Sequence, residues 1–212
     1  MPALLLPVTP ADLRPLGRVA YQTGFFGESA ARYFPDERLF ALLWVWPYLR
    51  TQTPGNLAAC GAGGEMLGYI LGETSPARYR RHLAAATLLG SLATLGGEVR
   101  HAPLACWSHL GRLARFSAPH ASERLYPAHL HINLLPQARG LGLGRQLLGA
   151  HLAALERAGV PGVQLSATAE NSAALGLYFS AGFSVLAEQE TDLWTPWLGR
   201  PTRQLVLGLR LA

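Results

Sequence analysis

Three glycines at alternate positions are the first residues whose spacing suggests chemistry. Gly140, Gly142 and Gly144 lie between a strand-like run, residues 129–135, and a helix-like run, residues 146–158. Glycine permits tight backbone conformations and lets a ligand approach the chain closely. The first N–H groups of a helix have no partner within it, and the helix dipole adds partial positive charge there. This order of elements therefore predicts a phosphate site.

Two known phosphate loops do not fit this spacing. A Walker loop needs Gly-Lys-Ser/Thr, and the 212-residue sequence contains no lysine. A dinucleotide fingerprint needs G-x-G-x-x-G, and here the third glycine comes one residue early. The remaining alternative is a helix start in which small residues only allow close packing.

A second segment, Glu170-Asn-Ser-Ala-Ala-Leu-Gly-Leu-Tyr-Phe-Ser-Ala-Gly-Phe183, predicts a capped helix. Asn171 is a good helix cap, and Gly182 is a good helix stop. Asn171 and Tyr178 are seven residues apart, which is nearly two turns, so they lie on one helix face.

Together the two segments resemble the GNAT acetyltransferases. Gln137-x-x-Gly140-x-Gly142, with Arg139, resembles the acetyl-CoA loop of that family, and Asn171-x6-Tyr178 followed by Gly182-Phe183 resembles its next helix. The resemblance covers about residues 128–186. It implies an α/β GNAT fold, a mixed six- to seven-stranded sheet flanked by helices. Residues 126–136 are also similar to bacterial relatives of the acetyltransferase-like domain attached to O-GlcNAcase, which does not define the acceptor.

The resemblance implies acetyl-CoA as co-substrate. Backbone amides from Arg139 to Arg145 would hold its pyrophosphate, and its pantetheine arm would pair with the preceding strand, through strand splaying, like an added strand. The same backbone could polarise the thioester carbonyl. The cofactor-binding residues expected are Leu134, Leu135, Pro136, Gln137, Arg139, Gly140, Leu141, Gly142, Leu143, Gly144, Arg145, Asn171 and Tyr178.

Transfer to an amine needs a base, because an amine is protonated at neutral pH. His131 is the first candidate, and His129 shares its strand face, where the family often carries the group that activates the acceptor. Many relatives have Glu there or act through water. A histidine hydrogen-bonded only for structure is the alternative, and the base could instead come from elsewhere, for example His109 or Glu123. His129 and His131 lack a third ligand of recognisable spacing, so no metal is expected.

Tyr178 matches the position of the family's acid for the leaving thiolate. A phenol is protonated at neutral pH and can donate its proton. The alternative is a tyrosine that only packs. Asn171 either binds the cofactor or caps its helix.

Hydrophobic periodicity and turn residues predict the remaining elements. Trp46 and Tyr48, in a helical aromatic stripe, belong either to the core or to an acceptor pocket. Further strands are expected at residues 4–8, 56–62, 65–72, 163–168, 184–194 and 202–211, and further helices at 9–23, 28–33, 36–49, 78–89 and 104–116.

A helical insertion at about residues 75–126 precedes the histidine strand. It holds seven arginines and two acids, so its net charge, 7 − 2 = +5, equals the formal net charge of the whole chain. One interpretation is a flap that attracts an anionic substrate or the cofactor phosphates. The other is solvated arginine on the outer faces of amphipathic helices.

Length and composition favour one domain with an insertion, and the resemblance implies that residues 1–212 form a single GNAT domain. Cys60 and Cys106 show no metal or disulfide spacing, and the N-terminus does not read as a signal peptide. We therefore expect a cytoplasmic, bacterial protein without a membrane span. Nucleic-acid binding is not favoured, because aromatic interleaving and a binding motif are missing. GNAT dimers are common, so a homodimer is a further expectation.

The function expected is acetyl-CoA-dependent N-acetyl transfer to a primary amine of a small molecule or peptide, by direct attack. The alternative is a non-catalytic acyl-CoA-binding or regulatory protein of the same fold.

Overall fold

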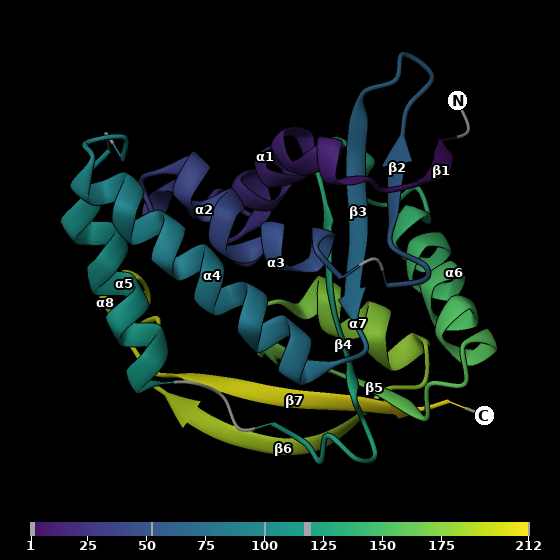
Figure 1. The fold of residues 1–212 in the computed structure, drawn as a ribbon. Helices are drawn as coiled ribbons and strands as arrows, with labels where there is room; N and C mark the ends of the chain where they lie inside the picture. Colours follow the sequence, from purple (N-terminus) through teal and green to yellow (C-terminus); the bar gives the residue numbers. More distant parts are fainter. Residues whose placement is uncertain (1–2, 52, 100, 117–119, 212) are drawn as a thin grey trace.

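A seven-stranded mixed sheet with helices on both faces forms the frame of the molecule (Figure 1). The computed structural model describes residues 3–51, 53–99, 101–116 and 120–211. Neighbouring strands are antiparallel except for β4 and β5, which are parallel. The strand order is β1 (Leu4–Pro7), β2 (Leu57–Cys60), β3 (Met66–Glu73), β4 (Ala128–Leu134), β5 (Gly162–Thr168), β7 (Thr202–Arg210) and β6 (Ser184–Thr191).

The helices divide between two cores, one on each face of the sheet. Tyr69 and Leu71 of β3 join the core beneath the helices of the N-terminal half and the insertion, whereas Ile70 joins the opposite core. Figure 1 shows the first four helices on one side of β3 and α6 on the other. The first group is α1 (Leu13–Thr23), α2 (Glu37–Trp44), α3 (Trp46–Leu49), α4 (Pro76–Leu95) and α5 (Pro103–Arg115); the second is α6 (Leu143–Arg157) and α7 (Ser172–Ser180).

The predicted α/β architecture is confirmed, but several element boundaries were wrong. Residues 28–33 form only the 3-10 turn Ala30–Arg32. The helix expected over 36–49 breaks at Val45, two residues before Pro47, which has no N–H to donate. The strand expected over 184–194 ends at Thr191, because the short helix α8 (Thr195–Leu198) begins soon afterwards.

The insertion folds into α4 and α5, and several of its arginines are bonded within the fold. Arg80 pairs with Glu123 at 2.6 Å. Arg112 Nε donates to the carbonyl of Leu193 at 3.2 Å, which joins α5 to the segment between β6 and α8. Arg100 lies outside the described residues. These bonds give Arg80 and Arg112 a structural role.

The pairing of β4 changes along its length. Six residue pairs, from Gly68↔Leu134 to Glu73↔His129, join it to β3. Only Ala128↔Val163 and His129↔Gln164 join it to β5. The two parallel strands therefore part after His129, and the backbone of residues 130–134 has no strand partner on that side among the described residues.

No helix in the described part of the chain is long and apolar enough to cross a membrane.

Candidate active site

A cavity of about 600 Å³ lies along the last residues of β4, beyond the point where β4 and β5 part. It extends to the start of α6 and to one side of α7. Eight of the predicted cofactor residues line it: Leu134, Arg139, Gly140, Gly142, Leu143, Gly144, Arg145 and Asn171.

The three alternating glycines have two different reasons to be glycine. Gly140 and Gly142 have φ of 74° and 76°, a left-handed conformation that side chains other than glycine rarely adopt. Gly144 lies within α6, where an added Cβ would lie 3.1 Å from a methyl of Leu134 and 3.3 Å from one of Leu177. Conformation sets the first two positions and close packing sets the third.

Gly142 caps α6 and aims the first turn of the helix at the cavity. Gln146 N donates to Gly142 O, so the N–H groups of residues 143–145 precede the first helical bond. Such N–H groups, together with the helix dipole, form an anion-binding site. The start of α6 therefore has the local geometry of an anion site, and phosphate binding by these residues stays a prediction.

The opposite wall of the cavity comes from the segment at the end of α1, which sequence reasoning missed. Arg139 Nη2 donates to the carbonyl of Gly27 at 2.5 Å, and Phe26 lines the cavity beside it. The amide of Asn133 donates to Thr23 Oγ1. These contacts join residues more than a hundred positions apart, so no local sequence pattern predicts them.

Five predicted cofactor residues are not among the described residues that line the cavity: Leu135, Pro136, Gln137, Leu141 and Tyr178. Leu141 is 61% exposed at the tip of the loop. Tyr178 is buried in the α6-side core, with its ring 5.8 Å from that of Phe183. Burial raises the pKa of the Tyr178 phenol well above its ordinary value, so it stays protonated at neutral pH. Its role as an acid stays a prediction.

The two predicted histidines, His129 and His131, lie on the face of β4 that points away from the α6-side core. Nδ1 of His131 is 3.1 Å from the hydroxyl of Tyr69, and the ring of Tyr48 stacks on His131 at 6.2 Å. The ring of Tyr79 meets that of His129 edge-on at 4.5 Å. Tyr48 is thus both a core residue and a neighbour of the candidate bases.

Burial controls the protonation of this histidine pair. It lowers the pKa of His131 to about 4, with His129 adding to the effect. It also lowers the pKa of His129 to about 4, although the charge of Glu73 opposes the change. Both rings are therefore neutral at pH 7 and can accept a proton. His109, the alternative base, lies instead on α5, 4.4 Å from the ring of Tyr33.

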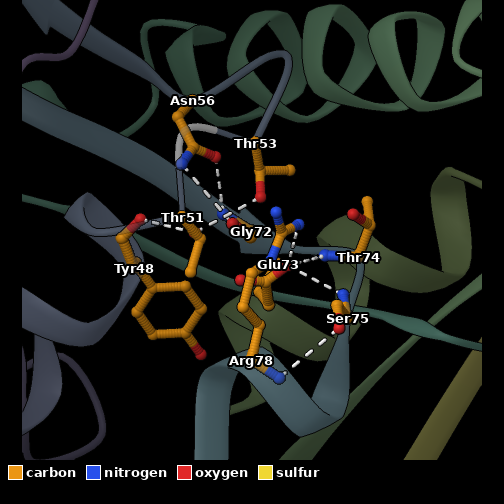
Figure 2. A network of polar contacts seen from close by, with 9 residues as sticks. All are labelled: Tyr48, Thr51, Thr53, Asn56, Gly72, Glu73, Thr74, Ser75 and Arg78. Carbon is orange, nitrogen blue, oxygen red and sulfur yellow. Dashed lines mark hydrogen bonds and ion pairs between the residues drawn. The ribbon is translucent and has the colours of Figure 1, made fainter. Parts of the chain in front are cut away.

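Glu73, like the segment at the end of α1, was not predicted from the sequence as part of the site. It ends β3, is fully buried and pairs in register with His129. Its Oε1 accepts from the backbone N–H groups of Thr74 and Ser75, each at 2.7 Å, and from Arg78 at 3.1 Å, as Figure 2 shows. The expected strand stopped at Gly72, one residue too early to reveal this carboxylate beside the histidine.

Residues 113–183 match the acetyltransferase (GNAT) family. The chain carries a GNAT acetyltransferase domain. The matched range includes β4, the glycine loop, α6, β5 and α7, and so most of the residues that line the cavity, but not those at the end of α1. The predicted family and enzyme class are confirmed.

Solved structures share this GNAT fold over the whole chain. The crystal structure of SsHAT is 27% identical with a TM-score of 0.74, and the match covers 100% of both chains. The ribosomal-protein-S18-alanine N-acetyltransferase of Escherichia coli is 17% identical (TM-score 0.59), covering 99% of this chain and 94% of that one. The phosphinothricin acetyltransferase of Sinorhizobium meliloti, in complex with acetyl-CoA, is 16% identical (TM-score 0.60), covering 100% and 90%.

Among the described residues, no three histidine, cysteine or acidic side chains gather as metal ligands. His129 and His131 have no third partner of that kind in this part of the chain.

Proposed function

We propose that this protein is an N-acetyltransferase that moves the acetyl group of acetyl-CoA to a primary amine by direct attack. One observation carries the proposal: the unpaired edge of β4 and the first turn of α6 open into the same cavity. An acyl thioester with a diphosphate at its far end needs both features.

Each part of the cavity has a task in this proposal. The amides of residues 139–145 bind the diphosphate. The backbone of residues 130–134 pairs with the pantetheine arm and holds the thioester near the start of the splay. The amine nitrogen attacks the acyl carbon, a C–N bond forms as the C–S bond breaks, and a neutral histidine of β4 receives a proton from the nitrogen.

The proposal names the acceptor only as a primary amine. Two proteins of this fold differ in the acceptor that their names give, ribosomal protein S18 alanine and phosphinothricin. A peptide amine and a small-molecule amine are therefore both within the proposal.

Calorimetry with acetyl-CoA, followed by release of free CoA over a panel of amines, tests the proposal. We expect binding without an acceptor, and steady CoA release that depends on the amine. Absence of any heat at millimolar acetyl-CoA would contradict both the cavity assignment and the activity.

The position of Tyr178 supports a second candidate, a non-catalytic acyl-CoA-binding protein. Its ring packs in the core and does not line the cavity among the described residues. Tight acetyl-CoA binding without CoA release for any amine would favour this second function.

A further inference from the structure

Two buried polar atoms on the histidine face of the sheet have no hydrogen-bond partner among the described residues: Oε2 of Glu73 and Nε2 of His129. Their residues are directly paired on β3 and β4, so both side chains project from the same face. The two atoms do not bond to each other. A polar group that bridges them would satisfy both.

The structural role of Glu73 explains only one of its two oxygens. Oε1 accepts the N–H groups of Thr74 and Ser75 and pairs with Arg78 at the start of α4 (Figure 2). Arg78 is 42% exposed at its side chain, whereas Glu73 has no exposed side-chain surface. Capping α4 therefore does not require Oε2, which points to a further partner.

The groups around Glu73 Oε2 and His129 Nε2 favour a hydrogen-bond donor that carries a positive charge. A carboxylate oxygen only accepts hydrogen bonds, and a neutral imidazole accepts one at its unprotonated nitrogen. The rings of Tyr48 and Tyr79 lie 5.3 Å and 4.5 Å from that of His129, and aromatic faces attract cations. Burial raises the pKa of both tyrosines, so neither adds a charge of its own. A primary ammonium has the N–H groups and the charge that this arrangement accepts.

We infer that Glu73 Oε2 and His129 Nε2 bind the ammonium group of the acceptor, and that the acceptor is a primary alkylamine. This inference depends on the proposed function. The ammonium gives one proton to His129 Nε2, which frees its lone pair for attack on the acyl carbon. As the C–S bond breaks, a second proton from the nitrogen goes to the thiolate, and His129 returns the first to solvent. The third proton stays on the amide product.

Glu73→Gln tests the inference with two amines, n-butylamine, a cation at neutral pH, and aniline, which is neutral. The variant keeps the size of the side chain and removes its charge. We expect kcat/KM for butylamine to fall roughly 10- to 100-fold, mainly through KM, because a charged hydrogen bond is lost. Aniline turnover and acetyl-CoA affinity should stay within about threefold. An equal loss on both amines would overturn the inference.

Arg78→Gln is the matched control. It removes the ion pair at Oε1 and leaves Oε2 unchanged. If Glu73 only supported the start of α4, this variant would reproduce the loss of butylamine selectivity. We expect it to keep the butylamine-to-aniline ratio of the natural protein.

Nitrogen NMR of His129 in the natural protein gives a test that needs neither turnover nor a folded variant. Butylammonium should shift the Nε2 resonance in a saturable way, and aniline should not. No shift would mean that the two atoms bind water only, and the inference would fail. If the protein releases no CoA with any amine, the proposed function fails, while this titration still decides whether the cation site exists.

Discussion

The two faces of β4 carry opposite kinds of side chain. Leu130 and Ile132 pack into the α6-side core, whereas His129, His131 and Asn133 face the helices of the N-terminal half. The apolar face helps to build the cofactor cavity, and the polar face carries the candidate acceptor chemistry. In the proposed function, this strand lies between the two substrates, and its backbone edge is the part that would meet the thioester.

The two sides also differ in how far apart their residues lie in the sequence. Many of the residues that line the cofactor cavity lie in one segment, residues 134–145, and others come from α7 and from the end of α1. The acceptor side joins α3, α4, β3 and β4, so single changes there should affect one substrate and spare the other.

Gly142→Asp should give the largest effect, loss of acetyl-CoA binding by calorimetry. The change forces an L side chain into φ 76° and adds negative charge at the first turn of α6. Gly149→Asp is the matched control. It puts the same charge on the same helix, at a position where an added Cβ meets nothing within 4 Å. Retained binding in the Gly142 variant would show that the loop is misassigned.

His131→Asn should give the next largest effect if His131, and not His129, takes the proton of the amine. If His131 is the base, kcat should fall by about 100-fold or more while acetyl-CoA affinity is unchanged. Since burial lowers the pKa of His131 to about 4, this ring stays neutral as the pH falls from 7 towards 5. The kcat of the natural protein should therefore not decline near pH 6.5, as it would with an unperturbed histidine. Stopped-time assays of kcat between pH 5 and 8 check this.

The sequence predicted the cofactor side better than the acceptor side for a physical reason. The glycines at 140, 142 and 144 and the cap at Asn171 act on their own neighbourhood, so their spacing alone defines the geometry. Glu73 becomes a neighbour of His129 only through strand register, and Thr23 meets Asn133 only through packing of α1 on the sheet. The break before α8 has a local contact of its own, since Asp192 Oδ1 accepts a hydrogen bond from Thr195 Oγ1, three residues further on.

His109→Phe should change the dependence of stability on pH by a moderate amount. His109 is 2% exposed among aromatic rings, and neither ring nitrogen has a partner in the described residues. Burial, helped by Arg112, lowers the pKa of His109 to about 4 in the folded protein, against about 6.5 when unfolded. The unfolded chain therefore binds a proton between pH 6.5 and 4 that the folded chain does not. Stability from this residue is present above pH 6.5 and lost as the pH falls.

Between pH 7 and 5 this loss amounts to about 2 kcal/mol for one histidine, at about 1.4 kcal/mol per pH unit below 6.5. Urea unfolding of the natural protein and of His109→Phe at both pH values measures it. The other buried histidines are common to both proteins and cancel in the difference. An identical pH dependence in both would show that His109 gains a proton freely in the folded state.

Tyr178→Phe should give the smallest effect. It tests whether a residue on the α6 side of the sheet takes part in the chemistry. Tyr178 belongs to the apolar, α6-side core, yet the family resemblance assigns its hydroxyl to the leaving thiolate. If it donates that proton, turnover should fall about tenfold or more with little change in acetyl-CoA affinity. A good leaving group would need the acid less, so a thioester of a more acidic thiol should restore part of the rate. Unchanged turnover would assign Tyr178 to packing alone, and the chemistry would then lie entirely on the polar face of β4.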